Sequence, residues 1–233
     1  MALVLPFLKL VRDGEEMKKR ILPICLIVIG LIFLITPTIK NYMVSSLSEK
    51  TYKNLTIEPE QESIIEQSKS IADIDFANDQ DVLKAMFSDT KNNTGIGLLA
   101  IPSVNLKLPI LREATNTNLL KGAGMMNEVF QGFDVGNVIL AGHHMKKEGL
   151  LFQPLMKLTE GESVYIMSHE KVYEYQMEKP YIVNEEDTSV LTEPFDGLTL
   201  ITCDVPTPTK KRLIYQGKLV NVVEKQEMEE IFH

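Results

Sequence analysis

Residues 164–177 read VYIMSHEKVYEYQM, two segments of alternating character on either side of the polar stretch Ser168–Lys171. Alternation with a period of two places successive side chains on opposite faces of a strand, so this stretch predicts a β-hairpin. Similar short apolar runs, separated by turn residues, continue from Gly95 onward and are typical of a small barrel or sandwich. Besides the two hairpin segments, the runs are Ile96–Ile101, Leu106–Leu111, Asn137–Ala141, Leu198–Cys203 and Arg212–Val223.

Composition limits the class of protein. The chain has 233 residues, of which 44% are hydrophobic, so it is long enough and apolar enough for one domain with a buried core plus an appendage. Its 24 basic and 32 acidic residues give a net charge of −8, and no local basic patch stands out. Both observations argue against a nucleic-acid partner. A glycine-rich phosphate loop is also missing from the sequence, which argues against nucleotide binding.

The N-terminal part contains an uncharged apolar run, residues 21–39 (ILPICLIVIGLIFLITPTI). As a helix this run would be roughly 28 Å long, enough to cross the hydrocarbon core of a bilayer. Residues 18–20 (KKR) precede it and Lys40 follows, so the excess of positive charge predicts a cytoplasmic N-terminus. A cleaved signal peptide is the alternative, but the run is long for one and no small-residue cleavage site follows.

The sequence therefore predicts four parts and a single-pass protein of the cell membrane. Residues 1–20 are a cytoplasmic segment and residues 21–39 a transmembrane anchor. Residues 40–80 form an extracellular stalk with short helices, because apolar residues recur there at near-helical spacing. Residues 81–233 form the extracellular β domain, where any catalysis takes place.

Two cysteines occur, and their places differ. Cys25 lies inside the predicted anchor, which leaves Cys203 as the single cysteine on the oxidising side of the membrane. A single cysteine in that compartment calls for a functional explanation. His143 and Arg212 also stand where an apolar run ends or begins. A thiolate with an imidazole to move protons is a minimal acyl-transfer pair, and an arginine can hold the developing oxyanion. Taken singly, a buried apolar cysteine, a structural histidine and a solvated basic turn remain alternatives.

The strings TLITC (199–203), AGH (141–143) and KR (211–212) resemble the sortases, cysteine transpeptidases of Gram-positive cell surfaces. The similarity runs from about Gly97 to Val223. It implies an all-β fold, an eight-stranded sortase-type β-barrel with short helices, here preceded by the N-terminal transmembrane helix. The best match is class A, because the connection from Val183 to Leu198 is too short for the helix-bearing loop of class B.

The resemblance also implies a reaction and its partners. Cys203 attacks the Thr–Gly carbonyl of a Leu-Pro-x-Thr-Gly sorting signal on a surface protein, and His143 protonates the leaving amine. The amine of a lipid-linked peptidoglycan precursor then resolves the thioester, while Arg212 orients the substrate. His144 is adjacent to His143, but neighbouring side chains of an extended chain point to opposite faces, and the family's Gly-His step selects His143.

Positions that match the family's Leu-Pro pocket are the candidates for substrate binding, although an ordinary core role explains each of them equally well. No cofactor is expected. Three acids, Glu128, Asp134 and Glu193, lie near positions that bind calcium in some class A members. Gln131 and Val135 fall in the same stretch, and calcium prefers six or more oxygen ligands, so no strong dependence on calcium is expected. The pocket candidates are Ala141, Leu119, Val190, Leu191, Thr199, Ile201 and Thr202.

Two other functions are compatible with the same residues. A surface β-module that keeps the barrel for adhesion predicts an unreactive Cys203. A simple cysteine peptidase differs only in that water resolves the thioester. A further hypothesis is that residues 60–90, with their apolar positions, fold back over the groove and regulate it.

Overall fold

The computed structural model describes residues 27, 30, 36–60, 63–64, 70–74, 79–87 and 94–233. The chain divides into two compact units, Met1–Tyr42 and Met43–His233, and the strands belong to the second. The predicted cytoplasmic segment and most of the predicted anchor, Cys25 included, fall outside the described residues. Within the described ranges, no helix combines the length and the apolar character needed to cross a membrane.

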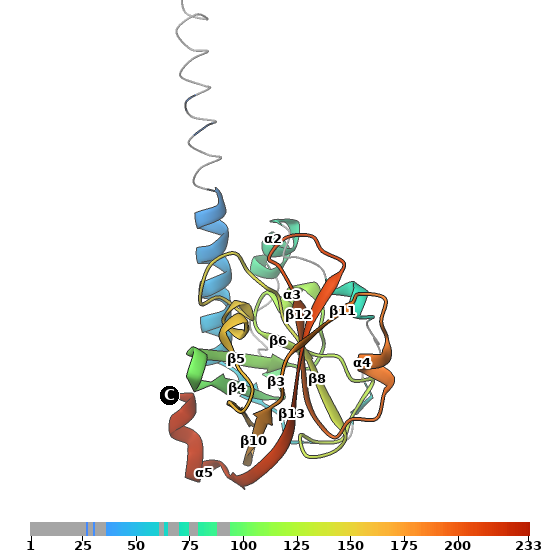
Figure 1. Ribbon diagram of the computed structural model, residues 1–233. Coiled ribbons are helices and arrows are strands. Elements are labelled where there is room, and N and C mark those ends of the chain that lie inside the picture. Colours follow the sequence, from blue (N-terminus) through green and yellow to red (C-terminus); the bar gives the residue numbers. More distant parts are fainter. Residues whose placement is uncertain are drawn as a thin grey trace, which may run out of the picture. The chain divides into compact units, whose positions relative to one another are not determined.

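A closed β-barrel forms the centre of the second unit (Figure 1). Eight strands pair around the barrel in the order β10-β9-β4-β5-β6-β8-β12-β13, and antiparallel pairing of β13 with β10 closes the circle. The predicted all-β class and strand number are therefore confirmed. The strands are β4 (Gly97–Ile101), β5 (Leu106–Leu111), β6 (Ala123–Met125), β8 (Asn137–Ala141), β9 (Ser163–Met167), β10 (Lys171–Met177), β12 (Gly197–Cys203) and β13 (Lys211–Glu224).

Each apolar run quoted from the sequence forms a strand. The hairpin is also confirmed: β9 and β10 pair antiparallel with Met167 opposite Val172, and the Ser168 N–H donates to the Lys171 carbonyl at 2.8 Å. Two strands of the nine-stranded sheet were not predicted, β6 and β11 (Tyr181–Asn184), which adds to the edge of β13. Neither has a usable pattern, because β6 has only three residues and β11 is largely exposed.

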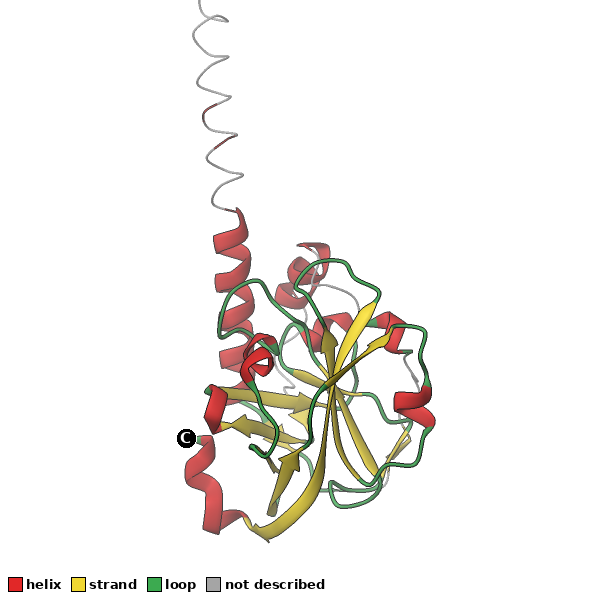
Figure 2. Cartoon of the chain, viewed as in Figure 1, coloured by secondary structure: helices red, strands yellow, loops and turns green. Residues whose placement is uncertain are grey.

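Short elements surround the barrel, with α4 and α5 plainly on its outside (Figure 2). Residues 43–53 are helical and place Val44 and Leu47 in the core. Two pairs of short strands, β1 with β3 and β2 with β7, connect residues 56–57 and 63–64 to later segments of the same unit. The remaining elements are β1 (Thr56–Ile57), β2 (Ser63–Ile64), β3 (Thr94–Gly95), β7 (Val129–Phe130), α2 (Asp79–Phe87), α3 (Asn116–Leu119), α4 (Ser189–Thr192), α5 (Lys225–Met228), and the 3₁₀ turns η1 (Ile71–Asp73), η3 (Pro102–Val104), η4 (Gln153–Lys157) and η5 (Glu229–Phe232).

The side chains of β8 and β12 divide between two apolar clusters. Leu140 and Leu200 belong to the main core, whereas Ile139, Ala141 and Ile201 belong to a separate cluster. This division follows from alternation, since successive residues of a strand face opposite sides of the sheet. The wall made by β8 and β12 therefore carries a second apolar surface on its other face.

Three buried tyrosines of the barrel use their hydroxyls as hydrogen-bond donors. Tyr215 donates to the Leu155 carbonyl, Tyr175 to the Phe133 carbonyl, and Tyr173 to the Glu60 carboxylate at 2.9 and 3.0 Å. Burial disfavours the charged phenolate and raises the pKa of Tyr215 to about 12. Burial also raises the pKa of Tyr175 well above its ordinary value.

These tyrosines make stability fall at high pH. The pKa of Tyr215 is about 10 in the unfolded chain and about 12 in the folded protein, so its contribution is complete below pH 10 and is lost as pH rises through 12. We expect a loss on the order of 2 kcal/mol from this residue between those pH values, measured by urea unfolding. Tyr215→Phe should flatten this slope and Tyr42→Phe, at an exposed position, should not. Equal slopes in all three proteins would contradict the assignment.

Candidate active site

The two parallel strands β8 and β12 place the predicted histidine and cysteine, His143 and Cys203, at the same end of the barrel. Strand β8 pairs parallel with β12, with Ala141 opposite Ile201. The Gly142 N–H extends this ladder by donating to the Ile201 carbonyl at 3.1 Å, and the Thr202 hydroxyl donates to the Gly142 carbonyl at 2.8 Å. His143 and Cys203 each follow two residues after the paired positions, so both stand at the same end of adjacent strands.

The third predicted residue, Arg212, lies directly opposite Cys203 in the antiparallel pair of β12 and β13. Residues opposite each other in such a pair have side chains on the same face. The Arg212 side chain is 2% exposed. Its Nη1 donates to the Thr209 carbonyl at 2.9 Å, and its Nη2 forms an ion pair with Glu185 Oε2 at 3.1 Å. The alternative of a solvated basic turn is therefore wrong for this arginine.

Gly142 has a steric role beside His143. A Cβ atom on Gly142 would lie 2.5 to 2.7 Å from ring carbons of Phe152, which means that the ring packs directly on the glycine backbone. The Phe152 N–H donates to the His143 carbonyl at 3.0 Å. The Gly-His step is thus explained by packing, since the phenyl ring fixes the backbone from which the buried His143 side chain projects.

The His144 side chain contacts the backbone at the end of β12. Its Nδ1 lies 2.9 Å from the carbonyl oxygen of Cys203, and the residue forms a β-bridge with Leu151. Leu151 is buried and has a φ of 51°, a left-handed conformation that side chains other than glycine rarely adopt. The structure thus gives His144 a role in holding the end of β12.

The structure brings most of the predicted pocket residues together. Leu119, Ala141, Val190 and Ile201 belong to one buried apolar cluster, and the partly buried Leu191 packs against it. The two threonines are not part of that cluster. Thr199 donates to the Asn137 side chain at 2.7 Å, and Thr202 belongs to the alternate face of β12, bonded to Gly142.

The carbonyl groups of Ile71 and Ile74 cover this end of the barrel. The Cys203 thiol donates to the Ile74 carbonyl with an Sγ–O distance of 3.7 Å, and Arg212 Nε donates to the Ile71 carbonyl at 3.2 Å. Cys203 is only 4% exposed and His143 only 3%. In this conformation the three side chains are closed off from solvent.

Sequence reasoning missed two residues of this arrangement. Glu185, which pairs with Arg212, follows β11 in an exposed stretch where one acid among several carries no distinguishing signal. The contact of Phe152 could be expected in part, because a glycine such as Gly142, immediately before a candidate catalytic residue, often marks a close approach of another group. The apolar spacing of Ile71 and Ile74 was visible in the sequence, but what they contact was not.

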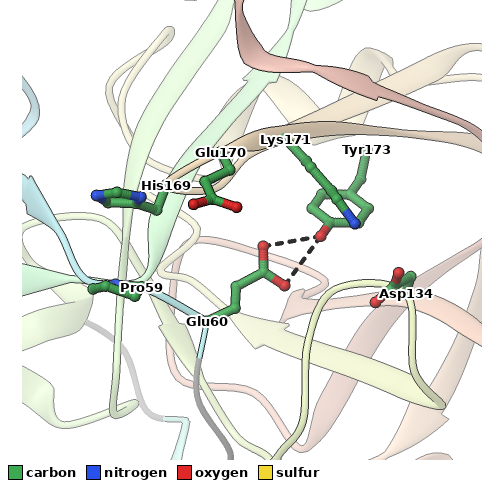
Figure 3. A pocket seen from close by; sticks show the side chains of 7 residues that line it. All are labelled: Pro59, Glu60, Asp134, His169, Glu170, Lys171 and Tyr173. Atoms are coloured by element: carbon green, nitrogen blue, oxygen red, sulfur yellow. Dashed lines mark hydrogen bonds between the residues drawn. The ribbon is translucent and has the colours of Figure 1, made fainter.

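A separate cavity of about 230 Å³ is lined by none of these residues (Figure 3). In the figure the Glu60 carboxylate points to the Tyr173 hydroxyl, with Asp134 across from them. Asp134 is one of the acids considered for calcium, but Glu128 and Glu193 are not part of this lining. Among the described residues, no group of three or more His, Cys, Asp or Glu side chains is placed to hold a metal ion.

A thiol, an imidazole and a guanidinium at adjoining strand ends of a closed barrel have the composition of a cysteine acyl-transfer site. The Sortase domain pattern matches residues 99–220. Sortase A of Listeria monocytogenes is 35% identical over 210 residues, 87% of this chain and 92% of the relative. Sortase A of Streptococcus agalactiae is 30% identical, covering 84% of this chain and 82% of the relative.

The structural comparison agrees with the sequence comparisons. The crystal structure of Listeria monocytogenes sortase A superimposes with a TM-score of 0.56 at 37% identity, covering 59% of this chain and 97% of that one. The chain therefore belongs to the sortase family and is most similar to class A. It is a cysteine transpeptidase, which excludes the alternative of a purely adhesive β-module.

The contact between Gly142 and Phe152 can be tested by a double-mutant cycle. Gly142→Ala should destabilise the protein by about 1 to 3 kcal/mol, because the new methyl group overlaps the phenyl ring. Phe152→Leu should also destabilise it, by leaving a cavity. Because the smaller side chain removes the clash, urea unfolding of the double variant should show a loss below the sum of the two. Additive losses would mean that the ring does not rest on the glycine.

Proposed function

We propose that this sortase cleaves Leu-Pro-x-Thr-Gly-type sorting signals between Thr and Gly and transfers the surface protein to an amine of a lipid-linked peptidoglycan precursor. The observation that carries the proposal is the strand register, in which Cys203 lies opposite Arg212 and His143 follows two residues after the adjoining parallel strand ends. Membership of the sortase family supports the same chemistry.

Each of the three residues has a separate task. The Cys203 thiolate forms a bond to the threonine carbonyl carbon, the C–N bond to glycine breaks, and His143 gives a proton to the leaving amine. The acceptor amine then attacks the thioester, His143 takes its proton, and the Cys203 thiolate leaves. Arg212 donates hydrogen bonds to the oxyanion in both steps, and because its side chain is buried these bonds act in a medium of low dielectric.

Leu119, Ala141, Val190, Leu191 and Ile201 would receive the leucine and proline of the signal, since together they form an apolar surface beside Cys203. We assign Thr199 and Thr202 to the support of β12, because their hydroxyls bond within the barrel wall. The enzyme would act outside the cell, held by residues 21–39 as a single-pass anchor with its N-terminus in the cytoplasm. No cofactor has a step in this scheme.

The residue assignments are tested by cleavage of a Leu-Pro-x-Thr-Gly peptide. Cys203→Ala should reduce turnover to background, and His143→Ala should reduce kcat/KM by about 10²- to 10⁴-fold. Arg212→Lys keeps the charge but loses the planar donors, and should cost about 10²-fold. His169→Ala, in the hairpin turn, and Arg112→Lys are matched controls that should retain full activity. A Cys203→Ala protein with undiminished turnover would refute the proposal.

Analysis of the reaction products distinguishes transfer to an amine from hydrolysis by water. With oligoglycine present as the acceptor amine, the peptide should be ligated in preference to being hydrolysed, and the acyl-enzyme should carry the mass of the peptide up to its threonine. Hydrolysis that stays dominant at saturating oligoglycine would favour the simple cysteine peptidase.

A further inference from the structure

Three pairs of opposed residues on β12 and β13 share the face of the sheet that carries the candidate active site. In an antiparallel pair of strands every second residue points to the same side, and residues opposite each other share that side. The three pairs therefore form a continuous surface, which begins at the candidate catalytic residues and becomes first apolar and then polar. In order away from the active site, the pairs are Cys203 with Arg212, Ile201 with Ile214, and Thr199 with Gln216.

Hydrogen bonds extend the third pair into a row of polar side chains across four neighbouring strands. Gln216 Oε1 accepts from the Tyr181 hydroxyl at 3.1 Å, and Gln216 Nε2 donates to Thr199 Oγ1 at 3.5 Å. Thr199 in turn donates to Asn137 Oδ1 at 2.7 Å. These four residues, here called the polar row, lie on β11, β13, β12 and β8, which are adjacent in the sheet.

The members of the polar row differ in exposure. Thr199 is fully buried and fixes the row to the barrel wall, whereas Gln216 is partly exposed and Tyr181 is 39% exposed. The Gln216 amide has two N–H hydrogens, of which one is directed at Thr199, and the Tyr181 oxygen keeps lone pairs after it has donated its hydrogen. Gln216 and Tyr181 can therefore offer a donor and an acceptor to a peptide that lies on this surface.

The distance from Cys203 to the polar row fits one particular residue of a sorting signal. A strand rises about 3.4 Å per residue, so Thr199 lies about 14 Å along β12 from Cys203. The leucine and proline of the signal precede its threonine and would lie on the side of Ile201, which belongs to the apolar cluster. An extended peptide advances at most about 3.3–3.6 Å per residue, so the residue four before the threonine reaches the polar row. This residue immediately precedes the leucine.

We propose that the polar row is a further substrate subsite, which binds the residue immediately before the leucine of the signal and favours an amide side chain there. The proposal rests on the function proposed above and extends its specificity by one position. A glutamine in the substrate can exchange hydrogen bonds with Gln216 and Tyr181. A valine would displace water from these groups without replacing its hydrogen bonds, which costs free energy.

The test measures binding to the full-length Cys203→Ala protein, because binding requires no turnover. Two labelled peptides, with glutamine or valine immediately before the same Leu-Pro-x-Thr-Gly signal, are compared by fluorescence anisotropy. The glutamine peptide should bind about fivefold more tightly, which is the ratio that one ordinary hydrogen bond supports. Equal Kd values for the two peptides would overturn the proposal.

Variants of the polar row assign the preference to its side chains. In the Cys203→Ala background, Gln216→Val should bring the preference for glutamine to onefold or below, because valine suits a strand and extends the apolar surface. Tyr181→Phe removes a single exposed hydroxyl and should lower the preference by a smaller amount. Gln176→Val makes the matched change at an exposed position of β10 and should leave the fivefold preference intact. A fivefold preference that persists in the Gln216→Val protein would contradict the assignment.

In the active enzyme the same preference should appear in KM, with equal kcat for the two peptides. The contact lies away from the scissile bond, so it stabilises the bound substrate and the transition state alike. A preference confined to kcat would be inconsistent with a binding subsite. Because both peptides carry the same signal, failure of the proposed reaction would abolish cleavage of both, whereas the ratio of their Kd values would still report on the polar row.

Discussion

The parallel register between β8 and β12 is the constraint on which the active site depends. Ala141 lies opposite Ile201, and the bond from Gly142 to Ile201 continues that ladder to the last residue before His143. A slip of one residue would turn every side chain of β12 to the other face of the sheet. It would also move Cys203 away from Arg212 on the neighbouring strand. Closure of the barrel through β10 and β13 prevents such a slip, since each strand is then held on both sides.

The same wall of the barrel serves folding and recognition at once. Alternation sends Leu140 and Leu200 into the main core and leaves Ala141 and Ile201 on a second apolar surface. Such a surface is unfavourable in water, because exposed apolar area is costly. In the described structure Ile71 and Ile74 cover it, and the carbonyls of the same segment meet Cys203 and Arg212. The segment with Ile71 and Ile74 therefore both covers the second apolar surface and closes the active site.

The active site also contains a buried positive charge, that of Arg212. Arg212 is 2% exposed, and its charge is tolerated because one carboxylate and several carbonyls surround it. The partners come from parts of the chain far apart in sequence: Glu185 follows β11, Thr209 precedes β13, and Ile71 begins the 3₁₀ turn η1. Fixed donors in a medium of low dielectric are well suited to stabilise a charge that develops during reaction.

The sequence by itself determined the strands of the barrel that have a clear alternating pattern, the hairpin at Ser168–Lys171, and the family, through TLITC, AGH and KR. These are local signals, because alternation and short motifs are read from neighbouring residues. The tertiary structure alone decided the order of the strands, the packing of Phe152 on Gly142, the partner of Arg212 and the segment that covers Cys203. Each of these depends on contacts between residues distant along the chain, for which spacing in the sequence gives no distance in space.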